Sequence, residues 1–302
     1  MMTARRGRRT VTPLSAPHAY VAPPDGWERT DSAGLGPFVT LERFQHPDGA
    51  VVEWTSREHR KRAGRLDAGR GSTWWAPTAI GWWIGVLFAV GAACFTVGAA
   101  PGYVDWVGTD ADAITFFVGS IFFTSAAYLQ YVQTLNAPHS LDGASGERLR
   151  FWTWEPGRID WSASLVQLVG TLFFNVTTFA AIDSSLNATQ AHRLVWVPDV
   201  VGSICFLVAS GLAWFEVSHG WWSWNSRSLS WRIAALNLAG SIAFGASAFA
   251  AKVVTTTGEP RNITLVNLGT AVGGLCFFVG ALFLLPERTL PDRTSVPSTT
   301  LH

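Results

Sequence analysis

The sequence has few of the residues and motifs that form disulfides, metal sites and catalytic centres. Its three cysteines, Cys94, Cys205 and Cys276, lie in separate apolar runs, and no CxxC or Cys/His metal spacing occurs. The HExxH and GxSxG motifs and a Gly-rich phosphate-binding loop are also missing. We therefore expect no disulfide framework, no cofactor and no enzymatic activity.

Charge is scarce as well. The formal net charge is only +1, so the chain has no global field that would attract nucleic acid, and we expect no nucleic-acid partner. The first 30 residues contain no apolar run. We therefore expect no cleavable signal peptide, and we expect the first apolar span to act as the insertion signal.

Long apolar runs occupy most of the chain from residue 78 onward. A helix needs about 20 mostly apolar residues to cross roughly 30 Å of hydrocarbon. Six runs are long enough, namely 78–99, 113–135, 161–182, 197–218, 231–253 and 264–285. The sequence therefore predicts an all-α membrane protein with six transmembrane helices.

The distribution of Lys and Arg predicts that both termini are cytoplasmic. With the N-terminus inside, the cytoplasmic segments hold 19 Lys and Arg and the outer loops hold 3. Cytoplasmic loops of membrane proteins carry such an excess. Most of the 16 Trp also fall on the proposed inner side, where indole rings favour the membrane–water interface. We expect a multi-pass protein of the cytoplasmic membrane.

A pattern of Trp, Gly and Phe recurs three times along the spans. In each odd-numbered span a Gly follows a Trp by nine residues and a Phe follows it by thirteen. The triplets are Trp82/Gly91/Phe95, Trp161/Gly170/Phe174 and Trp231/Gly240/Phe244. In each even-numbered span a Phe follows a Gly by four residues, at Gly119/Phe123, Gly202/Phe206 and Gly273/Phe277. The pattern predicts three tandem two-helix hairpins, at 78–135, 161–218 and 231–285, that pack closely at small residues.

The repeated even span, which reads Gly-Ser-Ile-x-Phe at 119–123 and at 202–206, follows a Trp-led helix with a mid-span Gly. This combination resembles the YrhK-like domain, a short two-helix membrane module of bacterial proteins with no established biochemical activity. The resemblance covers residues 78–285 as diverged copies. It implies a membrane protein of unknown function, and it supplies no catalytic or cofactor-binding residue.

Three polar residues occupy one equivalent position, fourteen residues after the Gly of each even span. They are Gln133, Glu216 and Glu287. We expect them at the cytoplasmic helix ends, where they cap the helices or extend to the interface. A carboxylate there opposes the helix dipole, so Arg227 or Arg288 is an expected partner.

Glu216 and His219 are also an i, i+3 pair on one helix face. Metal sites between helices use this Glu-x-x-His spacing. The second span carries Gln133 and Asn136 at the equivalent positions, so a second such motif is missing. We therefore favour a structural role for the pair and keep metal binding as the alternative.

Four amide side chains are expected to point into the bundle, because each would be costly against lipid. Gln167 and Asn237 occupy equivalent sites, six residues after their Trp, where the first span has Phe88. Asn175 and Asn267 add two more. Hydrogen bonds between helices are one role for these amides, and lining a solute pathway is the alternative.

The polar region before the first span has three predicted parts. Residues 1–36, and the C-terminal tail 286–302, have the composition of disordered segments. Within 37–77, the alternating runs 38–44 and 51–54 flank His46-Pro-Asp-Gly49 and predict a β-hairpin. Thr55-x-x-Glu58 is a capping box that opens a short basic helix.

The basic helix carries a cluster of cations, which are Arg57, Arg60, Lys61, Arg62 and Arg65. It lies shortly before the first span on the proposed cytoplasmic side. Basic segments in this position are attracted to anionic lipids of the inner leaflet. We therefore expect these residues to contact lipid headgroups.

The sequence favours a structural, sensory or scaffolding role in the bilayer, with assembly into a homo-oligomer as a further expectation. The alternative is a transporter that moves a small solute or ion along the buried polar residues. The Pro-x-acid-x-x-base signature of mitochondrial-type carriers is missing near Gly98, Ala180 and Ala250, where the odd spans end. This excludes that carrier family.

Overall fold

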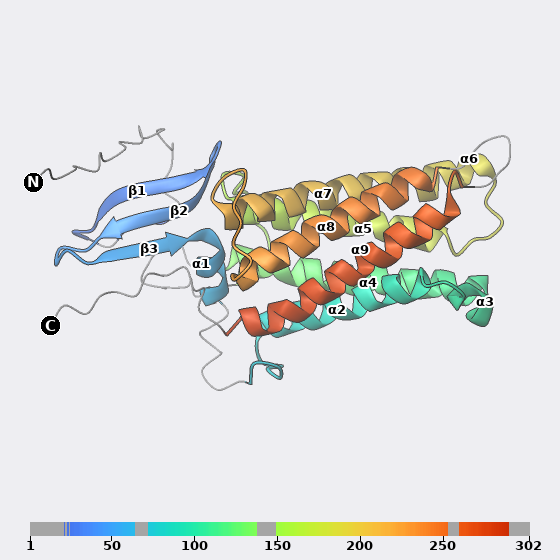
Figure 1. Cartoon of the computed structure of the whole chain (residues 1–302), viewed down its shortest axis with the longest axis horizontal. Coiled ribbons are helices and arrows are strands. Elements are labelled where there is room, and N and C mark those ends of the chain that lie inside the picture. Colours follow the sequence, from blue (N-terminus) through green and yellow to red (C-terminus); the bar gives the residue numbers. More distant parts are fainter. Residues whose placement is uncertain are drawn as a thin grey trace, which may run out of the picture.

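The computed structural model describes residues 21, 23, 25–63, 72–137, 149–252 and 260–289. Within these ranges, six helices are long and apolar enough to cross a membrane, and they run side by side as one bundle (Figure 1). They are α2 (Ile80–Gly98), α4 (Thr109–Leu135), α5 (Ile159–Ala180), α7 (Val197–Ser218), α8 (Leu229–Ala250) and α9 (Ile263–Glu287). These are the features of a multi-pass membrane protein.

The six helices form a closed ring in chain order. Each helix packs against the next one along the chain, and α9 packs against α2 to close the ring. Helices α2, α5 and α8 begin at the end of the bundle that carries the short helix α1 (Ser56–Ala63), and α4, α7 and α9 end there (Figure 1). We call this the α1 end. The opposite end carries the short helices α3 (Tyr103–Val107) and α6 (Ala188–Ala191) and the π-helical turn η1 (His192–Trp196).

Three helix pairs, α2 with α4, α5 with α7 and α8 with α9, are in close contact at the Gly residues of the recurring pattern. A Cβ atom added to Gly91 would lie 2.8 Å from the carbonyl oxygen of Gly119 in α4. The same substitution at Gly202 would place Cβ 3.1 Å from the carbonyl oxygen of Gly170. Gly240 and Gly273 face one another in the same way, also with 3.1 Å. The helix backbones therefore meet directly, which is the packing that lipid-embedded helices favour.

The Phe residues of the pattern meet in the middle of the ring as two triangles, which we call the Phe layers. The first triangle consists of Phe95, Phe174 and Phe244, and the second consists of Phe123, Phe206 and Phe277. Ring centroids are 5.9–6.3 Å apart in the first triangle and 5.6–6.1 Å apart in the second. The two rings of each helix pair are 5.1–5.5 Å apart. All six are buried, so aromatic contacts fill the centre of the bundle.

The Trp that opens each odd span anchors the loop before it. The indole Nε1 donates to the carbonyl oxygen eight residues earlier: from Trp82 to Trp74 at 2.8 Å, from Trp161 to Thr153 at 3.2 Å, and from Trp231 to Ser223 at 2.9 Å. Other indoles at the α1 end are exposed on the outside of the molecule. These are Trp74, Trp75, Trp152, Trp154, Trp221, Trp222 and Trp224. Exposed Trp at a bundle end is typical of the membrane–water interface.

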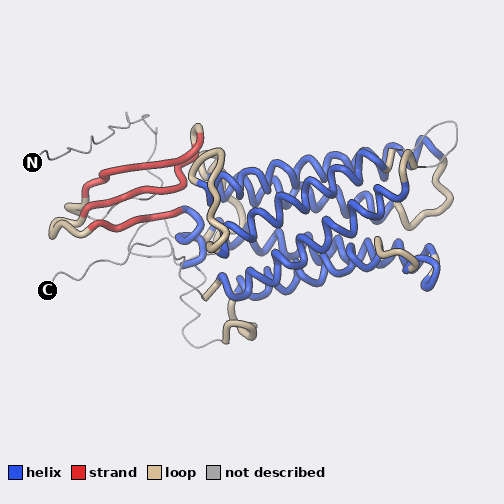
Figure 2. The backbone as a smooth tube through the Cα atoms, viewed as in Figure 1, coloured by secondary structure: helices blue, strands red, loops and turns tan. Residues whose placement is uncertain are grey.

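A small sheet and a short helix precede the bundle (Figure 2). Strands β1 (Glu28–Leu35), β2 (Phe38–Gln45) and β3 (Val51–Thr55) pair antiparallel in the order β1-β2-β3. Helix α1 (Ser56–Ala63) follows β3 directly. The β2–β3 hairpin matches the one predicted from the sequence, and the backbone N–H of Ala50 donates to Asp48 in its turn at 2.9 Å.

Strand β1 corrects the prediction that residues 1–36 are disordered. Most side chains of β1 are exposed, so the segment has little of the apolar alternation by which a strand is recognised. It is held by backbone pairing with β2, which is interrupted by two register irregularities. The predicted tail also begins too early, because α9 continues to Glu287, while residues 290–302 lie outside the described part of the chain.

Candidate functional site

A polar cavity lies inside the helix ring at the α1 end. Its volume is about 110 Å³, and all six membrane helices and α1 contribute side chains to its wall. A water molecule needs about 10–15 Å³ of such space. The cavity can therefore hold several waters or one small solute.

The bundle side chains around the cavity come from equivalent positions in the three helix pairs. Helices α2, α5 and α8 contribute the residues two and six places after the Trp. Helices α4, α7 and α9 contribute those eleven and fourteen places after the Gly. They are Ile84, Ala163 and Ile233; Phe88, Gln167 and Asn237; Gln130, Ala213 and Leu284; and Gln133, Glu216 and Glu287. The same four positions of each pair thus face one shared space.

The amides in this set lie on different sides of the cavity. Gln130 Nε2 in α4 donates to Gln167 Oε1 in α5 at 3.4 Å. Asn237 in α8 is close to α9, since a Cβ on Gly280 would lie 2.8 Å from Asn237 Oδ1. Gln133 lies nearer the mouth, next to Gly81. Gln130, Gln133, Gln167 and Asn237 therefore surround the cavity with groups that can both donate and accept hydrogen bonds.

The other two amides do not belong to the cavity. Asn175 is the residue after Phe174, which belongs to the Phe layers, and it is half-buried. Its Oδ1 has no hydrogen-bond partner within the described ranges. Asn267 is exposed on the outside of α9, contrary to the expectation that it points inward. Residues two places apart in a helix point in directions about 200° apart. Because Gly269 packs against Ser247, Asn267 faces away from the bundle.

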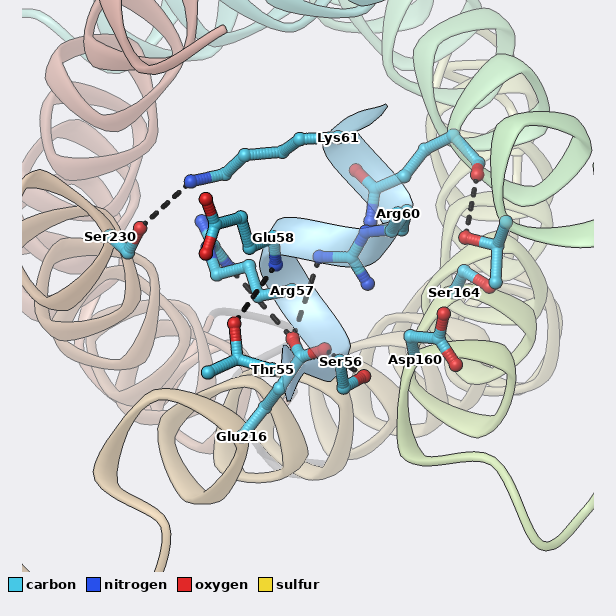
Figure 3. A network of polar contacts seen from close by, with 12 residues as sticks. Thr55, Ser56, Arg57, Glu58, Arg60, Lys61, Asp160, Ser164, Glu216 and Ser230 are labelled. Carbon is cyan, nitrogen blue, oxygen red and sulfur yellow. Dashed lines mark hydrogen bonds and ion pairs between the residues drawn. The ribbon is translucent and has the colours of Figure 1, made fainter. Parts of the chain in front are cut away.

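Helix α1 reaches Glu216 with three side chains, of which Arg57 is the most distant, with Nη1 3.9 Å from Oε2. Ser56 Oγ donates to Glu216 Oε1 at 2.7 Å, and Arg60 Nη2 donates to Oε2 at 3.4 Å (Figure 3). Glu216 itself is only 2% exposed. This carboxylate at the end of α7 is therefore satisfied by the N-terminal region of the chain and not by the exposed Arg227.

Glu287 at the end of α9 is bound by the same helix. Arg57 Nε donates to Glu287 Oε1 at 2.9 Å, and Lys61 Nζ lies 3.0 Å from that oxygen. Ser230 Oγ donates to it at 2.7 Å, and Lys61 Nζ also donates to Ser230 Oγ at 3.0 Å (Figure 3). Arg57, Arg60 and Lys61 are spaced i, i+3 and i, i+4, so one face of α1 presents all three cations to the bundle.

Contacts at the start of α1 and at the end of α7 hold this arrangement. The backbone N–H of Glu58 donates to Thr55 Oγ1 at 3.4 Å, which places the helix start at the predicted capping residue. His219 Nδ1 and Thr40 Oγ1 are 3.0 Å apart, so the sheet is tied to α7. His219 adopts the left-handed conformation, with φ of 50°, which turns its ring from the bundle toward β2.

The proposed metal pair is therefore divided between two partners. Glu216 binds Ser56 and Arg60, while His219 binds Thr40. Among the residues that the structure describes, no group of three or more His, Cys, Asp or Glu side chains could hold a metal ion.

The cations predicted to contact lipid headgroups have other partners here. Arg57, Arg60 and Lys61 line the cavity and pair with bundle carboxylates. The side chain of Arg62 and all of Arg65 lie outside the described residues. The sequence showed the basic face of α1 and the carboxylates at the helix ends, but not that tertiary docking brings them together.

Some residues of this site were missed by sequence reasoning. Ser230 precedes the Trp of the third pair, and the equivalent residues are Gly81 and Asp160. Asp160 is buried and pairs with Arg158 at 2.9 Å. The residue before each Trp is therefore a polar or small position at the mouth, which the threefold alignment could have revealed. Arg288 also lines the cavity, although it was expected only as a partner of a carboxylate.

Comparisons of the chain with protein-family models, with curated proteins and with solved structures gave no match.

Proposed function

We propose that this protein is a sensor in the cytoplasmic membrane, in which the helix ring binds a small solute and α1 reports whether the cavity is occupied. One observation carries the proposal: Arg57, Arg60 and Lys61 of α1 line the same cavity as the amides and carboxylates of the bundle. A solute in this cavity would contact α1 directly. It would therefore shift the balance between docked and released α1 by its difference in affinity for the two states.

The docking contacts are suited to a switch. Arg57 and Glu287 are paired at 2.9 Å with both side chains largely buried. Removing two charges from water costs about as much as their attraction returns, so a buried ion pair is close to balanced. A ligand that adds one interaction can therefore change the population of the docked state. The link from β2 to α7 through Thr40 and His219 would carry the change to the sheet.

Sensing is favoured over transport by what lies beneath the cavity. The Phe layers fill the ring between the cavity and the opposite end of the bundle, and Phe277 forms part of the cavity floor. The Gly contacts leave no space between the paired helices at this level. A solute that enters at the α1 end would meet a packed aromatic core.

We further propose that the α1 end faces the cytoplasm, so that both termini are inside. The excess of Lys and Arg at this end and its exposed Trp residues support that orientation. The variant Trp222→Cys places a thiol at the α1 end, and Trp106→Cys places one at the opposite end. A membrane-impermeant thiol reagent added to intact cells should label the second and not the first, and the reverse pattern would overturn the orientation.

We also infer that the bundle consists of three copies of one hairpin, each related to the YrhK-like module. The Trp–carbonyl bonds, the Gly contacts and the Phe triangles recur in all three helix pairs, which supports common descent. The copies also differ around the cavity. Phe88 takes the place of Gln167 and Asn237, and Gln133 takes the place of the two carboxylates. Divergence at these positions would turn a symmetric packing unit into a binding site.

The docking of α1 can be measured with two spin labels in nanodiscs. One label replaces the exposed Val51 of β3 and the other replaces the exposed Trp222 at the α1 end, in a chain with Cys94, Cys205 and Cys276 changed to Ala. We expect a narrow distance distribution in this background. The double change Glu216→Gln and Glu287→Gln should broaden it, because Arg57, Arg60 and Lys61 lose their carboxylates.

The matched control is Glu53→Gln, which removes a carboxylate that pairs with Arg43 within the sheet at 3.0 Å. This pair is more exposed than those of α1, so its loss should leave the distance distribution unchanged. A distribution that is equally narrow in the double variant would contradict docking by ion pairs.

Transport of a small solute or ion is the second candidate, because Gln167 and Asn237 place amides inside the membrane part of the ring. It predicts solute flux in liposomes that falls when Gln167→Leu and Asn237→Leu are introduced. Flux of that kind would replace the sensor proposal. Unchanged α1 docking and no flux in any variant would leave a purely structural or scaffolding role.

A further inference from the structure

The cavity wall carries more positive than negative side chains. Its cations are Arg57, Arg60, Lys61 and Arg288, and its anions are Glu216 and Glu287. Glu216 pairs with Arg60 and, at 3.9 Å, with Arg57. Glu287 pairs with Arg57 and Lys61. Asp160, at the same end, is paired with Arg158. Within the described residues, the wall of the cavity therefore has an excess of positive charge.

Arg288 is the cation whose hydrogen bonds are least complete. The residue is 7% exposed, and Nη2 donates to the carbonyl oxygen of Ser72 at 3.0 Å. Its Nε and Nη1 are buried and have no hydrogen-bond partner among the residues described. Burial lowers the pKa of this guanidinium. A buried donor without a partner is unfavourable, and more so when it is charged, so this position favours an anionic acceptor.

The surroundings of Arg288 leave room for that acceptor. The side chain lies beside Gly81, where an added Cβ would be 3.4 Å from Arg288 Cδ and 3.6 Å from Gln133 Nε2. In the second and third pairs the residue equivalent to Gly81 is Asp160 or Ser230, so this position carries no side chain in the first pair alone. An anion bound to Nε or Nη1 could also accept from the Gln133 amide.

The cavity changes in character from its mouth to its floor. Cations and carboxylates from α1 and from the ends of α7 and α9 lie at the mouth (Figure 3). Gln167 and Asn237 lie about a turn and a half further along their helices than the Trp residues that open them. Phe88 and Phe277 line the apolar part. A ligand with one anionic end and a short apolar end would match both parts.

We propose that the cavity binds a small organic carboxylate, with its carboxylate on Arg288 and its carbon chain toward Phe88 and Phe277. The inference deepens the proposed sensor function and rests on it only for the consequence of binding. An unpartnered guanidinium N–H donates a charge-assisted hydrogen bond to a carboxylate oxygen. The volume of about 110 Å³ limits the ligand to a few carbon atoms. Because the bound anion would offset the excess positive charge, it would stabilise docked α1.

The test uses the full-length protein in nanodiscs and calorimetric titration with propionate, acetate, inorganic phosphate and chloride. We expect propionate to bind more tightly than acetate, because its extra carbon contacts the apolar floor. Arg288→Gln should weaken propionate binding by about tenfold or more, since a charge-assisted pair is lost. Arg288→Lys should retain part of the affinity, and the exposed Arg150→Gln should bind as the unmodified protein does.

Several results would overturn the proposal. They are no binding of propionate or acetate to the unmodified protein, equal affinity in Arg288→Gln, and phosphate or chloride bound more tightly than both carboxylates. If Arg288→Gln does not fold, Asn237→Leu gives a second test, because a bulkier apolar side chain in the cavity should also weaken propionate binding. Propionate that binds the Glu216→Gln, Glu287→Gln variant without narrowing its broadened spin-label distances would contradict the sensor function alone. Docking that depends on Glu216 and Glu287, without any propionate binding, would contradict the ligand alone.

Discussion

At the scale of single residues, Glu287 shows how the site depends on groups far apart in the sequence. Its Oε1 lies within 3.0 Å of Arg57 Nε, Lys61 Nζ and Ser230 Oγ. Truncating one partner of such a buried charge cluster costs roughly 2–5 kcal/mol, largely because the remaining charges lose their partner. The carboxylate thus contributes more to the position of α1 than to the stability of α9, where a negative side chain at the C-terminus is unfavourable.

Another buried carboxylate, Glu42, lies in the sheet and not in the cavity. It is 0% exposed, and Arg29 Nε is 3.0 Å from its Oε1. Burial raises the pKa of this carboxyl, and Arg29 offsets only part of that effect. An acid with a higher pKa in the folded state binds its proton more tightly there. The resulting stability is full below the unfolded pKa near 4.5 and is lost as the pH rises through the folded pKa.

We therefore predict that the sheet becomes less stable as the pH rises above 4.5. Glu42→Gln should make this pH dependence shallower, because the amide does not ionise. Amide protection factors of β2, corrected for intrinsic exchange at each pH, measure the effect. The matched control is Glu53→Gln in β3, where the carboxylate is partly exposed beside Arg43. Equal pH dependence in the Glu42 variant and in the unmodified protein would exclude this carboxyl as the cause.

At the scale of elements, the Gly contacts decide how closely each helix pair can pack. A Cβ on Gly91 would lie 2.6 Å from Phe123 Cδ2 and 2.8 Å from the backbone oxygen of Gly119. Backbone cannot move aside as a flexible side chain can, so we predict that Gly91→Ala lowers stability by about 1–3 kcal/mol. Gly211→Ala is the matched control, because nothing lies within 4 Å of the added Cβ and Ala favours a helix by about 1 kcal/mol.

Thermal unfolding in detergent measures both variants. The melting temperature should fall for Gly91→Ala and should stay the same or rise for Gly211→Ala. A similar fall in both would mean that the close contact between α2 and α4 does not limit stability.

The membrane helices could be predicted from the sequence much better than the elements before them. Runs of apolar residues mark a span directly, because the bilayer requires about 20 of them. The structure moves the predicted start of α4 from residue 113 to Thr109 and leaves its end unchanged. The strand β1 was missed because backbone pairing holds it, and its side chains carry little apolar pattern.

The candidate site was predictable only in part. The Gly-based alignment of the even spans grouped Gln133, Glu216 and Glu287, and all three line the cavity. The α1 partners of Glu216 and Glu287 are 156 to 230 residues away in the chain, and no local pattern encodes that approach. Asn267 is as polar as Asn237, so the sequence alone placed both inside the bundle. The rotation of α9 about its axis places Asn267 on the outside instead.

At the scale of the whole molecule, a ring of six helices is blocked in the middle by the Phe layers and covered at one end by α1. The ring supplies the wall of a cavity, the Phe layers supply its floor, and the N-terminal region supplies cations at its mouth. Assembly into a homo-oligomer stays a prediction. We infer that the position of α1 depends on the bundle carboxylates Glu216 and Glu287.

Hydrogen–deuterium exchange of the α1 amides, in full-length protein in nanodiscs, tests that claim most directly. An eight-residue helix is not stable by itself in water, so protection of its amides reports docking. We predict strong protection of Ser56–Ala63 in the unmodified protein. With Glu216→Gln and Glu287→Gln together, protection of α1 should be lost while β2 stays protected. Unprotected α1 amides in the unmodified protein, or equal protection in the double variant, would show that these carboxylates do not hold α1 on the bundle.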